Sequence, residues 1–325
     1  MGKISKESGN PQGYSLAPLR SEIRKTPFPE EGSICAIIVT CQPDGDFPNR
    51  LRQIVPQVGK VIIVDNGSDE TCWNMLKKTR LGQPNVYLLR NHRNLGIAAA
   101  LNMGIRYASE TGSEWVLQLD DDSTPSETMV QEMIAAYKTY PGKNKIGIIG
   151  ANPVDKNTGG SAYKIKCLHK PCIEEKVIIS SGSLIPVEVF NQVGPLKDDY
   201  FIDGVDQEYC LRLRKKGYGV IVACQAKMMH SLGRPKVHKF LGMSLIPADY
   251  SPSRYYYISR NSLLMTKEYF FSEPHWIIQH LMGFIKRLVK MLLFEENKWV
   301  KVKSITKGIW HGLIGKAGPL NEDPV

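Results

Sequence analysis

The chain has 325 residues, 42% of them hydrophobic and 23% charged, and a formal net charge of +10 at pH 7. This composition is ordinary for a globular protein with a sizeable core, and the lack of a long uninterrupted apolar run speaks against a membrane-spanning protein. The basic excess fits nucleic acid, an anionic membrane or a phosphorylated substrate, but no zinc-finger spacing or aromatic RNA-binding signature accompanies it, so we expect no nucleic-acid partner.

The chain begins with a polar segment. Residues 1–32 are rich in Gly, Pro, Ser and charge, without sustained periodicity, so we expect a flexible N-terminal arm. No apolar stretch in residues 1–20 resembles a secretory signal. The seven cysteines include no CxxC pair and are too few for a disulfide scaffold. We therefore expect reduced thiols and a cytoplasmic location.

From residue 34 onward, short β-branched apolar runs alternate with helical stretches. The first run, Ile34–Thr40, is apolar almost throughout, which is typical of a strand buried on both faces. This alternation predicts βαβ units and an open, doubly wound, mostly parallel sheet. Further strands are expected at 61–65, 85–89 and 115–119, and helices at 47–58, 69–80 and 96–111.

The pattern becomes less regular after residue 122. Thr124-Pro125-Ser126-Glu127 has the residue order of a helix start, with Thr as the N-cap and Pro at the first helical position. We expect later strands at 146–150, 177–182 and 219–224, a helix at 205–216, and mainly helix from residue 255 onward. The sequence thus predicts one α/β domain followed by a helical C-terminal appendage.

Three consecutive acids, Asp120, Asp121 and Asp122, follow the fourth predicted strand. The helix start downstream does not require them, and adjacent carboxylates repel one another unless a cation or donor lies among them. Oxygen ligands of this kind suit Mg²⁺ or Mn²⁺. On spacing alone, a metal site and a solvated turn are equally good interpretations.

Other polar residues follow the first two predicted strands, at Thr40 and Asp65. Because ligands of such sheets bind beyond the carboxyl ends of the strands, we expect these residues and the acids at one rim. Taken alone, Asp65-Asn66-Gly67-Ser68 is better explained as a turn than as a binding motif. The small residues from Asn94 and Gly96 onward allow either close helix packing or the approach of a phosphate.

Two further acids, Asp203 and Asp206, begin the helix expected at 205–216. They would complement the helix dipole, but the intervening glycine also suits a carboxylate that projects into a cleft as a general base. His230 follows a strand. A lone histidine is usually not a ligand, although a metal site nearby would favour that role.

Eight segments, in this order, resemble the inverting family 2 glycosyltransferases of the GT-A fold, and more narrowly their bacterial rhamnosyltransferase branch. The similarity runs from about residue 34 to about residue 270. The segments are Val39-Thr40 with Pro43-Asp44, Val64–Ser68, Asn94–Asn102, Asp120–Asp122, Ser180-Ser181-Gly182, Phe201–Arg212, His230 with Gly233, and Tyr255–Asn261.

The resemblance implies a role for each matching residue. Asp206 would be the catalytic base, and Asp120, Asp122 and His230 would hold Mg²⁺ or Mn²⁺. Rhamnosyltransferases of this branch often have Asp-Gln-Asp where this chain has three acids, so both 120/122 and 121/122 remain open as the metal pair. The residues implied in donor binding are Thr40, Asp65, Asn94, Gly96, Asp120, Asp121 and Arg260.

The implied reaction transfers L-rhamnose from dTDP-L-rhamnose, with inversion, to a hydroxyl of a glycan or lipid-linked glycan. A family 2 transferase that uses UDP-galactofuranose or a UDP-hexose is the alternative. Two other classes of protein fit less well. A nucleotidyltransferase would have a Gly-rich basic loop where this chain has Gln42-Pro43-Asp44. A non-catalytic glycan-binding protein would need neither the acid triplet nor Asp206. The GT-A domain would span 33–272, with a nucleotide-sugar half at about 33–125 and an acceptor half at about 126–272.

The remaining region, 273–325, is basic and amphipathic. Within 276–294, residues Ile277, Leu281, Phe284, Ile285, Leu288 and Leu292 fall at helical spacing, opposite Gln279, Gly283, Lys286, Arg287 and Lys290. This pattern predicts a helix that lies on an anionic membrane surface, on the cytoplasmic face. The alternative, that the apolar residues pack on the catalytic domain or in a homodimer, stays open.

Overall fold

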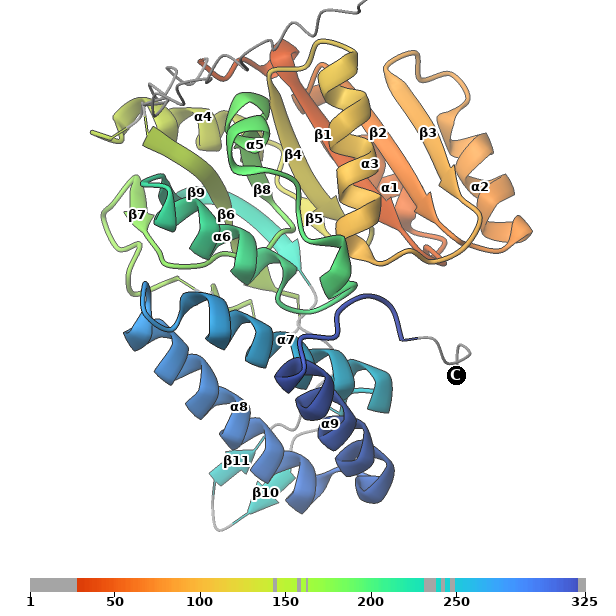
Figure 1. Ribbon diagram of the computed structural model, residues 1–325. Coiled ribbons are helices and arrows are strands. Elements are labelled where there is room, and N and C mark those ends of the chain that lie inside the picture. The colour runs from red at the N-terminus through yellow and green to blue at the C-terminus, as the bar shows by residue number, and fades with distance from the viewer. Residues whose placement is uncertain are drawn as a thin grey trace, which may run out of the picture.

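The computed structural model describes residues 28–320 except 143–144, 157–158, 162, 231–237, 241–242 and 246–248. Most of the N-terminal arm expected at 1–32, and Gly233, therefore lie outside the described residues. Figure 1 shows an α/β domain with three C-terminal helices packed beneath it.

The first half of the sheet is parallel, as predicted. Strands β1 (Ile34–Thr40), β2 (Lys60–Asn66), β3 (Val86–Asn91) and β4 (Trp115–Asp120) stand in the order β3-β2-β1-β4. They are connected by α1 (Phe47–Ile54) with the 3-10 turn η2 (Val55–Gln57), by α2 (Glu70–Arg80) and by α3 (Ile97–Glu110). Every residue of β1 is buried, which confirms the interpretation of its apolar run.

The second half of the sheet is mixed rather than mostly parallel. Strand β8 (Ser183–Pro186) pairs antiparallel with both β4 and β6 (Ile146–Asp155), while β9 (Gly219–His230) runs parallel to β6. It follows that β4, β6 and β9 all point in one direction. The carboxyl ends of β1, β2, β4 and β9 therefore lie at the same edge of the sheet. The short strand β7 (Cys172–Glu174) pairs antiparallel with β9.

The helix start predicted at Thr124 is wrong. Thr124 and Pro125 form the short strand β5, which pairs antiparallel with Met229 and Met228 of β9, and α4 begins only at Met129 (Met129–Thr139). Pairing with a strand that is distant in sequence outweighs the local capping pattern. This pairing also brings the acid triplet beside the end of β9.

The strand predicted at 177–182 is wrong as well. Residues 177–179 have no regular structure, and Gly182 adopts a positive φ of 75° in a turn that leads into β8. A side chain at Gly182 would be strained there, and its Cβ would lie 2.9 Å from the Cβ of Ala151. Ile178 of this apolar run is in the core, but the backbone there is not part of a ladder.

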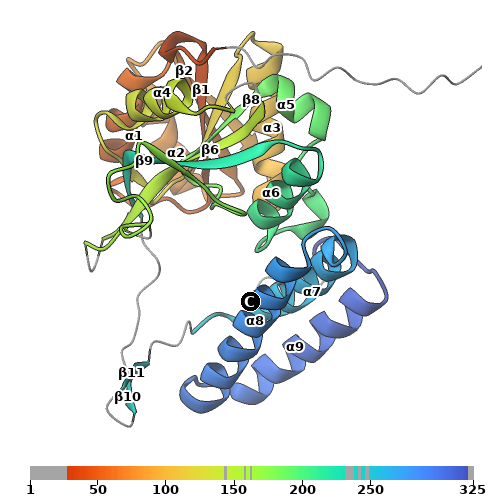
Figure 2. The same cartoon turned by 90° about the vertical axis from the view of Figure 1, so that its left-hand side faces the viewer.

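Helices cover both faces of the sheet. Alternate residues of β1 enter the two cores: Ile37 and Val39 pack with α3, and Ile34 and Ile38 pack with α1. Figure 2 shows α1 and α4 on one side of the sheet and α3, α5 (Val187–Val193) and α6 (Val205–Lys215) on the other. This arrangement fits the expected α/β class.

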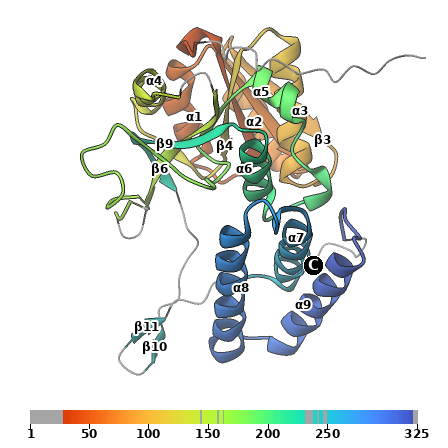
Figure 3. The ribbon, with the colours of Figure 1, turned by 60° about the vertical axis from the view of Figure 1, so that its left-hand side comes forward.

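Three helices, α7 (Pro252–Tyr269), α8 (Pro274–Phe294) and α9 (Lys298–Leu313), form the C-terminal part, and Figure 3 shows them side by side. Helix α9 approaches α7 closely at two glycines. A Cβ at Gly308 would lie 2.4 Å from the carbonyl oxygen of Tyr256, and one at Gly312 would lie 2.9 Å from that of Arg260. A hairpin, β10 (His238–Phe240) and β11 (Met243–Leu245), precedes α7.

One disulfide contradicts the expectation that all cysteines are reduced. Cys167 and Cys224, 57 positions apart in the sequence, are bonded, and their Cα atoms are 5.3 Å apart. Only the fold brings them together, because one lies in the segment before β7 and the other in β9. The five other cysteines are free.

Candidate active site

The edge at which β1, β2, β4 and β9 end collects most of the residues singled out in the sequence. Thr40 and Asp120 are the last residues of β1 and β4, Asp65 is the next to last of β2, and His230 is the last of β9. The parallel strands account for the first three, as predicted. His230 arrives there because β9 runs in the same direction as β4.

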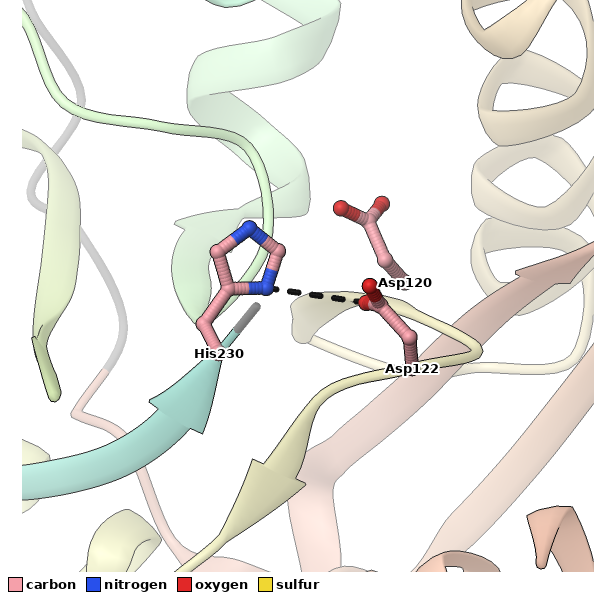
Figure 4. A group of neighbouring side chains, drawn as sticks. All are labelled: Asp120, Asp122 and His230. Atoms are coloured by element: carbon pink, nitrogen blue, oxygen red, sulfur yellow. Dashed lines mark ion pairs between the residues drawn. The ribbon is translucent and has the colours of Figure 1, made fainter. Parts of the chain in front are cut away.

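Asp120, Asp122 and His230 form a cluster with the geometry of a metal site. Their ligand atoms all lie within 4.8 Å of one another, and His230 Nδ1 is 3.6 Å from Asp122 Oδ1. Figure 4 shows the imidazole and the two carboxylates facing a common space. Two hard oxygen ligands with one imidazole suit a divalent cation.

Two serines that the sequence interpretation did not assign hold this cluster in place. Ser123 Oγ lies 2.9 Å from His230 Nδ1 and 2.8 Å from Ser181 Oγ. The backbone N–H of Asp120 donates to Ser181 Oγ over 3.0 Å. Ser181 belongs to one of the eight segments that carry the resemblance, but nothing in the local sequence links either serine to the histidine.

The electrostatics of the cluster also fit a cation. Burial, followed by the nearby carboxylates of Asp122 and Asp121, raises the pKa of Asp120 to about 7. Burial lowers the pKa of His230 below its usual value, which favours the neutral imidazole that binds metals. A divalent cation would relieve the repulsion among the carboxylates, so the residues present fit a metal.

Asp121 lies apart from the cluster. Its Oδ2 accepts a hydrogen bond of 3.3 Å from the backbone N–H of Cys41, and its carbonyl oxygen accepts one of 2.6 Å from Arg50 Nε. The side chain is thus directed toward the end of β1. Of the two metal pairs left open by the sequence, the geometry favours Asp120 with Asp122.

The end of β2 carries a buried carboxylate with a basic neighbour. Asp65 is fully buried, its Oδ1 accepts from the backbone N–H of Ser68 at 3.2 Å, and its Oδ2 is 3.4 Å from Arg90 Nε. The guanidinium of Arg90 stacks over the ring of Trp73 at 4.7 Å. Neither Arg90 nor Trp73 was singled out from the sequence, because each stands in an ordinary strand or helix pattern.

Thr40 is also fully buried, and its hydroxyl has no hydrogen-bond partner among the described residues. A buried polar atom without a partner is costly, and binding of a ligand is one way to satisfy it. This observation agrees with a role of Thr40 in donor binding.

Asn94 and Gly96 both shape the backbone at the start of α3. Asn94 Oδ1 accepts from the backbone N–H of Gly96 at 2.8 Å and from Asn66 Nδ2 at 3.0 Å. Gly96 has a φ of 87°, and a Cβ there would lie 2.6 Å from the carbonyl oxygen of Phe201. That oxygen accepts from the N–H of Ile97 at 2.8 Å, so the start of α3 is tied to the loop before α6.

Asp203 and Asp206 occupy different environments. Asp203 receives hydrogen bonds from Arg254 Nε and Nη2, each at 3.1 Å, so it is already paired with a basic side chain. Asp206 has no basic partner in the described residues, and its Oδ1 accepts from the N–H of Gln207 at 2.8 Å. Burial, and then the charge of Asp203, raises the pKa of Asp206 to about 6. A base needs a free carboxylate, so the geometry favours Asp206.

Arg260, which was expected to bind the donor, instead holds the loop before α6. It is fully buried, and its Nη2 donates to the carbonyl oxygens of Asp199 at 2.7 Å and Tyr200 at 3.2 Å. The adjacent Asn261 Nδ2 donates to the carbonyl oxygens of Tyr200, Ile202 and Asp203 at 2.7 to 3.0 Å.

This support matters because the loop is strained. Phe201 and Asp203 have φ values of 62° and 60°, a region that residues other than glycine rarely adopt. Such backbone persists only where surrounding contacts impose it. We therefore interpret Arg260 and Asn261 as positioning residues for the acids at the start of α6.

Residues 35–194 match the sequence profile described as "Glycosyl transferase family 2". The chain is 34% identical over 250 residues to the dTDP-rhamnosyl transferase RfbF of Shigella flexneri, a match that covers 73% of this chain and 80% of that protein. It is 24% identical over 254 residues to the galactofuranosyltransferase GlfT1 of Mycolicibacterium smegmatis, covering 71% and 82%.

Solved structures share the fold. S. aureus TarS 1-349 superposes with a TM-score of 0.56 at 11% identity, covering 86% of this chain and 80% of that one. GalNAc-T7, crystallised with UDP, GalNAc and Mn²⁺, gives a TM-score of 0.54 at 15% identity, with 73% of this chain covered. This chain spans about half of the GalNAc-T7 chain, 49%.

Proposed function

The chain belongs to glycosyl transferase family 2, and on that premise we propose that it transfers L-rhamnose from dTDP-L-rhamnose to an acceptor hydroxyl with inversion of configuration. The observation that carries this proposal is the 34% identity to a dTDP-rhamnosyl transferase over 73% of the chain. The cluster of Asp120, Asp122 and His230 at the sheet edge, with Asp206 nearby, supplies the groups that such a transfer requires.

In this proposal Asp206 is the general base. Its carboxylate would take the proton from the acceptor hydroxyl as the oxygen attacks the anomeric carbon from the face opposite the leaving group. One displacement of this kind inverts the configuration. A pKa of about 6 leaves Asp206 ionised at neutral pH and makes it a better proton acceptor than an ordinary aspartate.

Asp120, Asp122 and His230 would hold Mg²⁺ or Mn²⁺, and Ser123 and Ser181 would keep the imidazole and the backbone of Asp120 in place. A bound divalent ion would stabilise the negative charge that develops on the leaving diphosphate.

Donor binding is assigned to the nucleotide half. The buried carboxylate of Asp65 would accept hydrogen bonds from the base or ribose, and the unpartnered hydroxyl of Thr40 lies at the end of the neighbouring strand. Asn94 and Gly96 shape the start of α3 beside them. The alternative donor, UDP-galactofuranose, is supported by the 24% identity to a galactofuranosyltransferase.

The acceptor is proposed to be a glycan or lipid-linked glycan, reached on the cytoplasmic face of a membrane. Residues 274–318 contain eight Lys or Arg against two Glu, a net charge of +6 in this region, which favours an anionic surface. A homodimer is the competing use of the C-terminal helices. The disulfide between Cys167 and Cys224 is unusual for a cytoplasmic protein.

Release of nucleotide diphosphate tests the donor assignment. The purified chain with Mn²⁺ is incubated with dTDP-L-rhamnose, UDP-galactofuranose and UDP-hexoses in turn, with water as the acceptor of the sugar, and the free nucleoside diphosphate (dTDP or UDP) is measured. We expect the fastest release from dTDP-L-rhamnose, and Asp206→Asn as the control should lose it. Faster release from a UDP-sugar would reassign the donor, and release from none would leave the chain without the proposed activity.

A further inference from the structure

Helix α8 has two apolar faces, and packing uses only one of them. On the inner face, Ile277 and Met291 are buried, and Leu281, Phe284 and Leu288 pack against the cores beside them. The outer face carries a row of six apolar residues at helical spacing, each between 48% and 58% exposed: Ile278, Met282, Ile285, Val289, Leu292 and Leu293. The six apolar residues that the sequence placed on one face of the helix therefore lie on two faces, because Ile285 and Leu292 are on the outer one.

An apolar row of this length is unusual on an exposed helix. A helix that packs on one side normally carries polar residues on the other, and contiguous exposed apolar patches commonly mark interaction sites. The inner face of α8 is sufficient to hold it against the rest of the protein. We therefore expect another surface to cover the outer row.

The charge of α8 indicates what that occupant is. The helix contains no Asp or Glu and three basic residues, Lys286, Arg287 and Lys290. Lys286 and Lys290 each follow a member of the outer row by one position, about 100° around the helix, so they border the row. An apolar strip bordered by lysines complements a surface that is apolar beneath and anionic at its rim.

We propose that the outer face of α8 docks in the headgroup plane of an anionic membrane. No helix among the described residues is long and apolar enough to cross a bilayer, so the contact would be at the surface. Exposed aromatic side chains flank the helix in sequence, Phe271 before it and Trp299 after it, at 93% and 86% exposure. Such side chains favour the membrane interface.

A second copy of the chain fits the outer row less well. The row runs from residue 278 to residue 293, so its midpoint is near Ile285. A two-fold antiparallel pairing about that point would bring Lys286 of each copy toward Lys286 of the other. Like charges there would oppose the dimer, whereas anionic headgroups would attract the same lysines.

The inference rests on the proposed function only in that docking would bring the site to a lipid-linked acceptor. Membrane binding itself does not need sugar transfer. Release of the nucleoside diphosphate from a nucleotide sugar in solution therefore remains a separate measurement, so failure of one proposal is distinguishable from failure of the other.

Co-sedimentation of the full chain with vesicles tests the proposal. We expect binding to vesicles of phosphatidylglycerol and phosphatidylcholine at low salt, and little binding to phosphatidylcholine alone. Ile285→Ser with Val289→Ser, or Lys286→Glu with Lys290→Glu, should weaken binding about tenfold or more. The matched control, Leu81→Ser with Ile165→Ser, removes two apolar residues of 77% and 90% exposure from the catalytic domain and should bind normally.

Because the altered residues are exposed or border the exposed face, the variants should remain folded by circular dichroism. Wild-type protein that stays in the supernatant with anionic vesicles would overturn the proposal, as would equal loss of binding in the control variant. A vesicle-free dimer that the Ile285→Ser and Val289→Ser changes convert to a monomer would assign the face to a second copy instead.

Discussion

The two acids at the start of α6 differ in whether each is paired with a basic side chain. Asp203 is paired with Arg254, while Asp206 accepts only from backbone groups. Asp206→Asn keeps the size of the side chain but removes the proton acceptor, so kcat should fall about 100- to 10,000-fold with donor binding retained. Steady-state kinetics with calorimetric donor binding would measure both.

Asp203→Asn is the matched change in the same loop. It should lower activity less, since it weakens the pairing with Arg254 but leaves the base intact. An inactive Asp203→Asn beside a nearly normal Asp206→Asn would reverse the assignment.

The pKa of Asp206 also predicts a pH dependence. The base acts only when ionised, and its pKa is raised to about 6 by burial. The value of kcat/KM should therefore rise with pH through about 6 and level off above it, whereas an ordinary aspartate near 3.8 would leave the rate flat in this range. A rate profile in saturating metal, with the stability of the protein checked at each pH, measures this. A flat profile from pH 5 to pH 8 would be inconsistent with Asp206 as the base.

The metal cluster predicts an effect on stability that does not depend on turnover. A cation that binds the folded state raises the melting temperature, and at about 100 times its Kd the shift should be about 2 °C or more. Asp122→Ala removes one of three ligands and should abolish both the shift and the activity. Calorimetric melts with and without Mn²⁺ provide the measurement. Equal responses of the wild type and the variant to the metal, or full activity in excess EDTA, would contradict a metal site at this cluster.

At the scale of elements, helix α7 acts on the site through the loop it holds. Asn261→Ala removes three hydrogen bonds to the strained loop before α6 without touching the donor site. We expect kcat to fall about tenfold or more with the donor KM little changed, because only the placement of Asp206 is disturbed. The control on the same helix is Ser253→Ala, an exposed position. A rise in KM with unchanged kcat would place Asn261 in substrate binding instead.

The regular elements were largely predictable, and the two exceptions have different physical causes. The strands β1 to β4 and the helices between them follow local apolar periodicity, and they appear within a few residues of the expected bounds. The predictions failed at Thr124 and at 177–182, where pairing with β9 and a turn at Gly182 decide the backbone. Those contacts join residues about 100 positions apart or depend on a positive φ, and no local pattern reports them.

The candidate site likewise contains residues that the sequence predicts and residues that it does not. Asp65, Asp120, Asp122 and Asp206 could be predicted because strand ends and helix starts place them. His230 was expected there only from the family resemblance. The supporting groups could not be predicted, since Ser123 and Ser181 reach His230 only through the direction of β9, and Arg90 reaches Asp65 from the next strand. The role of Arg260 became clear only from its burial.

The arrangement of the whole chain brings the carboxyl edge of the sheet to face the three C-terminal helices (Figure 1). The C-terminal segment even contributes to the loop before α6, because the N–H of Gly318 donates to the carbonyl oxygen of Asp199 at 2.8 Å. This part of the chain thus supports the loop before Asp206, the proposed base, while the outer face of α8 is exposed. One chain would in this way combine donor binding, proton removal and access to an acceptor.

Donor specificity and the metal site are tested together by calorimetric titration of dTDP-L-rhamnose. We expect saturable binding to the wild-type chain with Mn²⁺, tighter than for UDP-galactofuranose or UDP-hexoses. EDTA or Asp122→Ala should weaken this binding sharply while the protein stays folded. Binding that is equally tight without metal, or tighter for a UDP-sugar, would contradict this expectation.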